Sequence, residues 1–139
     1  MNVSGAQTAS FEVRDYECDL QGIVNNAVYL HYLEHARHQV LKRAGFDFAS
    51  LTAQGIHLVV VKAEVEYKTP LRSGDTFLVT SRVERLTPVR FVFLQDIHRT
   101  TRRTPRILSV TSRFTCAAMN ATGKPIIPTM LEPLLGRAR

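Results

Sequence analysis

The chain has 139 residues, of which 45% are hydrophobic and 22% charged, and its formal net charge is +6 at pH 7. This length and balance favour a single globular domain with one sizeable core and exclude a low-complexity chain. The positive charge permits an anionic partner, but no basic stretch alternates with aromatic residues, which favours small anionic ligands over nucleic acid.

The chain begins with small, polar residues, and we expect residues 1–9 to form a flexible tail. They lack the charged start and apolar run of a secretory signal, and no apolar run approaches the ~18 residues that a membrane-spanning helix needs. The cysteines, Cys18 and Cys116, form no motif. We therefore expect a reduced, cytoplasmic protein with one domain over residues 1–139.

The most informative stretch reads DYECDLQGIVNNAVYLHYLEHARHQVLKRAG. A polar turn with Asp19 and Gly22 leads to Asn25 and Asn26, either of which is a good helix N-cap. The apolar residues that follow recur at helical spacing and predict a helix of roughly five turns. Gly45 is typical of the position just beyond a helix end. The residues on the apolar face are Tyr29, Leu33, Ala36 and Val40.

Alternating apolar and polar residues predict a short strand around Phe11 and Val13 and, after a loop over 46–55, four longer strands. These cover residues 57–68, 76–85, 89–98 and 107–119. Their connections are short, which indicates antiparallel neighbours. The C-terminal segment PIIPTMLEPLLGRAR is expected to hold one short helical turn between its prolines.

One long helix cannot bury its apolar face by itself. The sequence therefore predicts an α+β domain in which a curved antiparallel sheet wraps around the helix. Residues 58–61 are apolar in succession, so both faces of that strand need cover. We expect a second subunit to supply some of it, in a two-fold dimer or a dimer of dimers.

Asp19 stands just ahead of a long helix, whose first N–H groups lack intrahelical acceptors. A carboxylate beside donors aimed at a developing oxyanion is the arrangement that acyl transfer requires. The alternative is structural, because Asp before a helix is commonly a turn or cap residue. Asn25 and Asn26 have the same alternative as caps, and Tyr29 either packs in the core or lines a pocket.

The segment YECDLQGIVNNAVYLHYLEHAR resembles the signature of the hotdog-fold thioesterases of the 4-hydroxybenzoyl-CoA thioesterase type. In that family an Asp-x-x-Gly-[Ile/Val]-Val segment precedes the central helix, and here it stands as Asp19-Leu20-Gln21-Gly22-Ile23-Val24. With PLRSGD downstream, the chain is similar to the small plastid acyl-ACP thioesterases of plants and their bacterial relatives. The likeness extends from Phe11 to the end of the last long strand.

The resemblance implies a hotdog fold and hydrolysis of acyl-CoA or acyl-ACP thioesters without metal or organic cofactor. Asp19 matches the catalytic aspartate, as nucleophile or as general base on water. The backbone N–H of Asn26 matches the oxyanion donor, and Gly22 matches the glycine that keeps the turn tight. Many relatives have Tyr-His where this chain has Asn25-Asn26, which removes an imidazole and leaves the backbone donor.

We expect further residues to bind the substrate. Val59 and Val60 are expected to set the depth of the pocket, and His57 precedes them in the region where the family's second subunit supplies pocket wall. Relatives carry basic residues near the strand at 89–98, which favours Arg90 as a phosphate contact. The expected substrate-binding residues are Val24, Asn25, Tyr29, His57, Val59, Val60 and Arg90.

Other charged residues have simple interpretations. Glu34 and Arg37 are three apart on the helix, which predicts a surface ion pair, with a ligand phosphate as the alternative partner of Arg37. Two groups of arginines serve solubility or clamp the phosphates of CoA or a carrier protein. The first group is Arg82, Arg85 and Arg90, and the second, in a predicted hairpin loop, is Arg99, Arg102, Arg103 and Arg106.

Three helix histidines, His31, His35 and His38, share one side of the helix. HxxxH spacing can bind zinc, but there is no Glu in the HExxH position and no further ligand, so we expect a solvated or interfacial face.

Three other functions compete with hydrolysis. A non-hydrolytic module that binds acyl-CoA or acyl-ACP would keep the pocket and need no Asp19. A hydratase or dehydratase of the same fold would use a His soon after the Asp, and here the first is His31. A nucleic-acid binder rests on the net charge alone.

Overall fold

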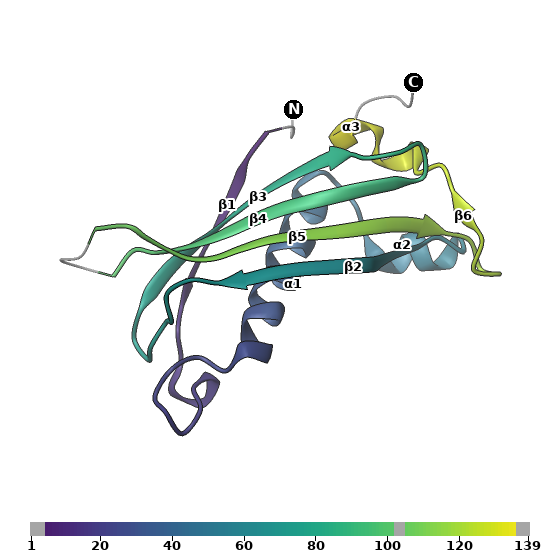
Figure 1. Cartoon of the computed structure of the whole chain (residues 1–139). Helices are drawn as coiled ribbons and strands as arrows, with labels where there is room; N and C mark the ends of the chain where they lie inside the picture. Colours follow the sequence, from purple (N-terminus) through teal and green to yellow (C-terminus); the bar gives the residue numbers. More distant parts are fainter. Residues whose placement is uncertain (1–4, 102–104, 136–139) are drawn as a thin grey trace.

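The computed structural model describes residues 5–101 and 105–135 and shows one antiparallel sheet with a long helix across it (Figure 1). The strands are β1 (Gln7–Glu12), β2 (His57–Tyr67), β3 (Thr76–Arg85), β4 (Arg90–Arg99), β5 (Ile107–Met119) and β6 (Pro125–Ile126). The helices are α1 (Asn26–Arg43), α2 (Phe48–Ala53) and α3 (Glu132–Leu135), with 3-10 turns at Asp15–Glu17 and Thr129–Leu131. The expected α+β architecture is confirmed.

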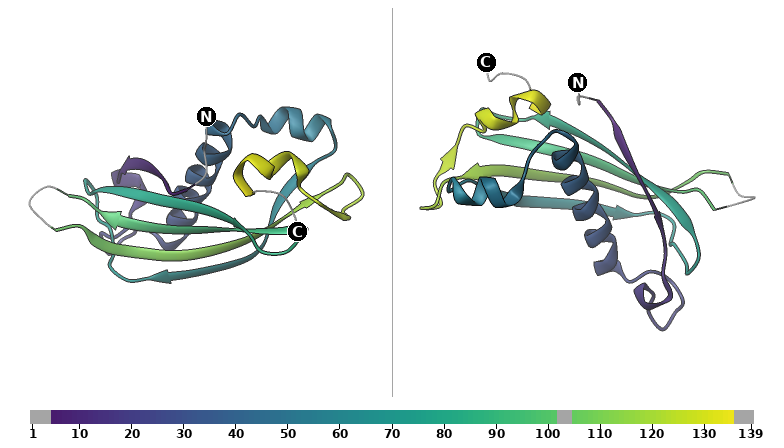
Figure 2. Two further views of the ribbon diagram at one scale, coloured as in Figure 1. Left: turned by 90° about the horizontal axis from the view of Figure 1, so that it is seen from above. Right: turned by 180° about the vertical axis from the view of Figure 1, so that it is seen from behind.

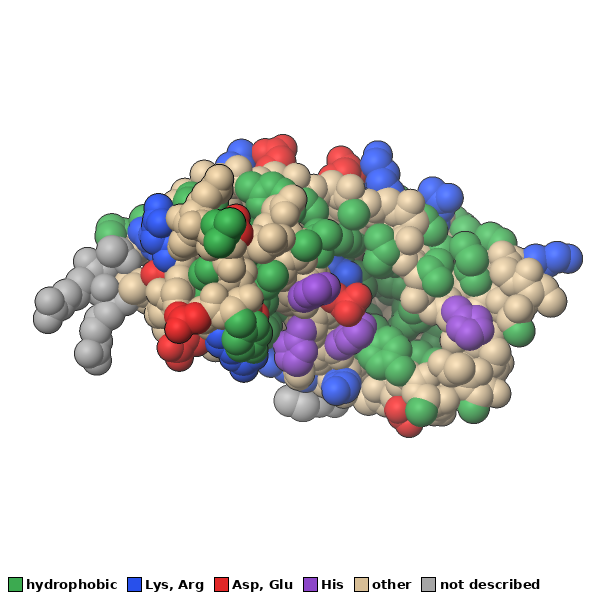
Figure 3. Space-filling view, turned by 90° about the horizontal axis from the view of Figure 1, so that it is seen from below, with side chains coloured by type: hydrophobic (Ala, Val, Ile, Leu, Met, Phe, Trp, Pro, Cys, Tyr) green, Lys and Arg blue, Asp and Glu red, His purple; other side chains and the backbone are tan. Residues whose placement is uncertain are grey.

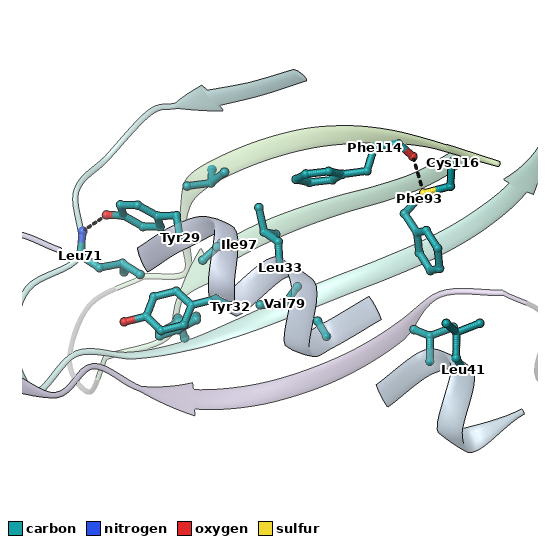
Figure 4. Close-up of a cluster of buried hydrophobic side chains, with 14 of the residues drawn as sticks. Tyr29, Tyr32, Leu33, Leu41, Leu71, Val79, Phe93, Ile97, Phe114 and Cys116 are labelled. Carbon is teal, nitrogen blue, oxygen red and sulfur yellow. Dashed lines mark hydrogen bonds between the residues drawn. The ribbon is translucent and has the colours of Figure 1, made fainter. Parts of the chain in front are cut away.

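The helices lie on one face of the sheet, as the two views of Figure 2 show. Asn25 caps α1 by accepting the Ala27 N–H at 2.9 Å, and Gly45, with φ of 90°, follows its last turn. The apolar face of α1 packs onto the strands, where Leu33 is fully buried near Val79 and Ile97 (Figure 4). None of the described helices is long and apolar enough to cross a bilayer.

The strand order is β1-β3-β4-β5-β2, with β6 on β5. β2 therefore pairs with β5 and not with β3, so the expectation that strands adjacent in sequence are neighbours is wrong at this point. The segment between them, residues 68–75, passes the start of α1. Its backbone groups form hydrogen bonds with residues outside the sheet instead of closing a hairpin between β2 and β3. Leu71 O accepts the Val24 N–H at 2.8 Å, and Gly74 N–H donates to Val13 O at 3.0 Å.

Three other boundaries differ from the expectation. Residues 7–9 belong to β1, paired with residues of β3, and not to a tail. The loop expected over 46–55 contains α2, which Asp47 caps by accepting the Ala49 N–H at 3.1 Å. The C-terminal segment holds a two-residue strand and two short helical turns where one turn was expected. Arg102 and Arg103 lie outside the described residues, so their place in a clamp stays a prediction.

β2 is an edge strand that nothing in the described chain covers on its outer side. Val60 and Val61 are 46% and 40% exposed. The apolar run at 58–61 is thus left partly uncovered by its own chain. A long edge strand with exposed apolar side chains is a template for pairing with another strand.

Candidate active site

A tight loop carries Asp19. Cys18 and Val24 form an antiparallel bridge at its base, and inside it the Asp19 N–H donates to Ile23 O at 2.9 Å. Gly22 N–H donates to Asp19 O at 3.0 Å, with Gly22 at φ of 80°. L-residues rarely adopt that conformation, so the turn that places Asp19 depends on glycine.

The Asp19 carboxylate is exposed and held by its own loop. Its Oδ1 accepts the Gln21 N–H at 2.8 Å, a bond that fixes the direction of the side chain. Its Oδ2 has no hydrogen-bond partner among the described residues. One oxygen is therefore anchored, and the other is available to a ligand or a water molecule.

The start of α1 supplies an unused donor. The Asn25 side chain takes the Ala27 N–H, and the Asn25 carbonyl takes the Val28 N–H at 2.9 Å. The Asn26 N–H has no acceptor within the described part of the chain. Asn25 thus acts as the cap of α1, which was the structural alternative to a direct role at the site. Asn26 keeps a free N–H at the positive end of the helix dipole.

A cavity of about 330 Å³ brings these groups together. Its wall comes from the Asp19 loop, the first turn of α1 and the end of β2. The lining residues include Asp19, Ile23, Val24, Asn26, Tyr29 and Tyr67. Its volume is at the lower end of the range for small-molecule sites.

Tyr29 and Tyr67 form the aromatic side of this cavity. Tyr29 is buried, and its hydroxyl accepts the Leu71 N–H at 2.9 Å (Figure 4). Burial raises the pKa of Tyr29, so the phenol stays neutral. The Tyr67 hydroxyl donates to the Asn26 carbonyl at 3.1 Å, and the two rings meet edge to face with centroids 5.4 Å apart. Tyr29 therefore both packs in the core and lines the cavity.

Tyr67 is a site residue that sequence reasoning missed. It looks like the last apolar residue of an alternating strand, and nothing in that pattern points to a site. The signal that could have found it is its place at the end of β2, just before the turn that crosses beneath α1.

Five of the seven expected substrate-binding residues do not line this cavity within one chain. Asn25 caps α1 beside it, and the other four lie far from it. His57, Val59 and Val60 lie at the beginning of β2, and Tyr67 at its end. An 11-residue strand spans about 33 Å at ~3.3 Å per residue, which separates the two ends. Arg90 is exposed at the beginning of β4, where it pairs with Ala117, the residue that also pairs with Val59. It therefore lies at the same end of the sheet.

The expected surface ion pair between Glu34 and Arg37 is wrong. Arg37 is only 8% exposed, and its Nη1 donates to Gln95 Oε1 at 3.0 Å. It turns inward because the strands offer a buried acceptor and an aromatic face, with its guanidinium carbon 4.1 Å from the centre of the Phe114 ring. Glu34 is exposed and forms no ion pair among the described residues.

The helix histidines differ in surroundings. His31 and His35 are exposed, whereas His38 is half-buried against Phe48, with ring centres 4.7 Å apart. Within residues 5–101 and 105–135, no group of His, Cys, Asp and Glu side chains is arranged to hold a metal ion.

Comparisons with known proteins identify the family of this chain. A model of the thioesterase-like superfamily matches residues 13–134. The chain is 34% identical over 103 residues to the chloroplastic acyl-acyl carrier protein thioesterase ATL2 of Arabidopsis thaliana, which covers 74% of this chain and 55% of that protein. The chain spans about half the length of the first two curated relatives it matches, 55% and 43%.

Solved structures share the fold. A hypothetical protein from Aquifex aeolicus is 28% identical, with a TM-score of 0.82 over 92% of this chain and 98% of that one. The 4-hydroxybenzoyl CoA thioesterase from Pseudomonas sp. strain CBS-3 is 18% identical, with a TM-score of 0.84 over 93% of this chain and 98% of that one. The second likeness shows the hotdog fold alone.

Proposed function

The chain belongs to the thioesterase-like superfamily, and on that premise we propose that it hydrolyses acyl thioesters of CoA or acyl carrier protein in the Asp19 cavity. The observation that carries the proposal is that Asp19, which has a free carboxylate oxygen, and Asn26, which has an unpaired N–H, line one cavity. The names of the similar proteins support the substrate class.

The proposed reaction begins with the thioester carbonyl oxygen accepting the Asn26 N–H. A donor of this kind lowers the barrier by up to ~3–4 kcal/mol, because it strengthens as negative charge develops on the oxygen. No imidazole stands at Asn25 or Asn26, so Asp19 is the group beside the carbonyl that can act as base or nucleophile.

Asp19 has two possible roles in this scheme. As a general base it takes a proton from water, whose oxygen bonds to the carbonyl carbon while the carbon–sulfur bond breaks. The proton then passes to the departing thiolate. As a nucleophile it forms an anhydride with release of the thiol, and water then hydrolyses the anhydride. Both routes give one acid and one thiol.

Thiol release from a panel of acyl-CoAs and acyl-ACPs tests the proposal. Asp19→Asn keeps the size of the side chain and is expected to lower kcat at least a hundredfold. Asp47→Asn is the matched control, because asparagine caps α2 as well as aspartate does. Turnover that survives in Asp19→Asn would remove Asp19 from the mechanism. Tight acyl-CoA binding without turnover in the wild type would favour a non-hydrolytic binding module.

We also propose a homodimer joined through β2. Two copies of this edge strand, paired antiparallel about Lys62, would set Val59 against Val65 of the partner subunit and His57 against Tyr67 of the partner subunit. The beginning of one β2 would then lie beside the other chain's Asp19 cavity, where Val59 and Val60 could contact substrate as expected. Unpaired edges and exposed Val60 and Val61 support this arrangement.

Light scattering tests the assembly. Val61→Lys is expected to shift the protein from dimer to monomer, since it places a charge in the proposed interface. Thr80→Lys on β3, which lies away from β2, is the control and should leave the mass unchanged. A monomeric wild type would contradict the proposal.

A cytoplasmic location is a further proposal, supported by Cys18 and Cys116 not being joined in a disulfide.

A further inference from the structure

A second cavity, of about 640 Å³, lies between β1, the 3-10 turn at Asp15–Glu17 and one side of α1. It shares no lining residue with the Asp19 cavity. β1 is the edge of the sheet opposite β2, so the proposed homodimer through β2 does not cover this cavity. Figure 3 shows histidine side chains gathered on one face of the molecule, with acidic and basic side chains beside them, and His31 and His35 line this cavity.

Carboxylates dominate the charge of the cavity wall. Glu12 and Glu17 line it, and among the described residues neither forms an ion pair. Glu17 is half-buried, so water screens its charge less than that of a surface carboxylate. Its Oε1 accepts the Arg14 N–H at 2.8 Å, whereas its Oε2 has no hydrogen-bond partner in the described part of the chain.

Arg14 is the basic residue of this wall, but its guanidinium is engaged elsewhere. Its Nη1 donates to the hydroxyl of Tyr16 at 2.8 Å, and its guanidinium carbon lies 6.0 Å from the centre of the Tyr16 ring. Tyr16 is not among the lining residues. The cavity therefore keeps a negative side that no cation of the described chain pairs with.

Tyr32 contributes a buried hydroxyl without a protein partner. The residue is 5% exposed, and its hydroxyl forms no hydrogen bond within residues 5–101 and 105–135. In Figure 4 the hydroxyl points away from Leu33 and Val79. Burial raises the pKa of Tyr32, and the Glu17 carboxylate raises it further, so Glu17 stands near the hydroxyl. Leaving such a group without a partner costs free energy that a hydrogen-bonding ligand would recover.

Phe11 gives the cavity an aromatic wall. One face of its ring stacks on Phe77, with centroids 5.1 Å and planes 8° apart. Because β1 is an edge strand, no strand of the described chain covers the other face. Tyr32 and His35 contact the ring at centroid distances of 5.8 and 5.6 Å. The face of an aromatic ring carries negative potential, so beside carboxylates it favours a cation.

We propose that this cavity binds a small organic ammonium ion with N–H donors and an apolar body. The ammonium group donates to the free Oε2 of Glu17 and to the hydroxyl oxygen of Tyr32, and the body lies on Phe11. A primary ammonium has three donors, which is enough for both acceptors. A metal ion does not match, because no group of His, Cys, Asp and Glu among the described residues is arranged to hold one.

Calorimetric titration of the full chain with benzylammonium and with benzyl alcohol, which share one carbon skeleton, tests the proposal. It is run at pH 8, where free imidazole is uncharged and does not repel a cation. The wild type is expected to bind benzylammonium at least about tenfold more tightly, because only the ammonium is charged. The inference does not depend on thioester hydrolysis, so the two can fail separately.

A matched pair of variants tests the carboxylate. Glu17→Gln keeps the size of the side chain and an acceptor for the Arg14 N–H, removes the charge and should abolish the preference for benzylammonium. Glu84→Gln makes the same change on the exposed surface of β3 and should preserve it. Ser10→Trp, at the exposed rim of the cavity, should weaken both ligands by filling the space, which keeps a test available if Glu17→Gln fails to fold.

Tyr32→Phe separates binding from folding. It removes the hydroxyl and keeps the ring, and it should weaken benzylammonium binding about three- to tenfold. The Tm should not fall, because the hydroxyl has no hydrogen bond to lose within the described chain. A purely structural hydroxyl would give the reverse result, a lower Tm with unchanged binding.

Several results would overturn the inference. Benzylammonium binding no tighter than benzyl alcohol binding, or a preference that survives in Glu17→Gln, would remove this carboxylate from the site. Asp19→Asn should bind benzylammonium as the wild type does, and loss of binding there would place the amine in the other cavity. If benzylammonium does not bind and Glu17→Gln lowers the mass in light scattering, the cation that Glu17 accepts belongs to another copy of the chain.

Discussion

The Tyr67 hydroxyl donates to the carbonyl of Asn26 at 3.1 Å, which joins the end of β2 to the first residue of α1. These residues are 41 positions apart, and the bond sets the aromatic wall of the cavity against the proposed oxyanion donor. The geometry of the helix start thus depends on a strand at the edge of the sheet.

Tyr67→Phe removes this bond and keeps the ring. We expect kcat to fall about three- to tenfold, since one neutral hydrogen bond contributes about 0.5–1.5 kcal/mol, while the Tm changes little because Tyr67 is half exposed. Steady-state kinetics and thermal unfolding measure the two effects. Tyr16→Phe, on a largely exposed side chain away from the cavity, is the control. Unchanged kinetics in Tyr67→Phe would show that α1 holds Asn26 without help.

Gly22→Ala tests the turn that carries Asp19. A Cβ at Gly22 meets no atom within 4 Å, so the cost is the strain of a positive φ alone, about 1 kcal/mol. Gly123→Ala is a matched control, with φ of 83° and equally open space in a distant turn. Both variants should lose similar stability in urea unfolding, and only Gly22→Ala should lose activity. Equal activity in both variants would show that catalysis does not depend on the conformation of this turn.

Asn25 offers a way to separate capping from chemistry. Asn25→Ala removes the acceptor of the Ala27 N–H and should destabilise the fold by about 1 kcal/mol. Asn25→Asp keeps the cap and should keep the stability, but its negative charge beside the oxyanion donor should lower kcat. Chemical denaturation and thiol release give the two readouts. An Asn25→Asp enzyme of full activity would argue against negative charge developing near the helix start.

Alkaline pH should destabilise the protein through Cys116. Burial raises the pKa of this thiol to about 11, above its ordinary value. At a pH between these two values, the unfolded state has lost the thiol proton, whereas the folded state keeps it. Stability from this group is complete below the ordinary thiol pKa and falls as pH rises toward 11, by about 2 kcal/mol. Urea unfolding from pH 8.5 to 11 measures the loss, which Cys116→Ala should reduce. Equal pH dependence in the two proteins would contradict this cause.

Local patterns in the sequence were sufficient for much of this protein. Helical spacing from Tyr29 to Val40 and the Asn25 cap define α1 because both depend on residues a few positions apart. Alternation defines the long strands for the same reason, and the spacing of Asp19 and Gly22 ahead of the helix indicates the candidate site. These features need no knowledge of which strand pairs with which.

Only the tertiary structure decided where distant segments meet. β2 pairs with β5, while the segment after it forms backbone hydrogen bonds with Val24 and Val13 near the start of α1. The length of β2 then separates Val59, at its beginning, from the cavity that Tyr67 lines at its end. Arg37 turns inward because Gln95 and Phe114, on two other strands, offer an acceptor and a ring face. Helical spacing reveals which residues share a face, but it contains no information about the distant residues that complete the surroundings of a side chain.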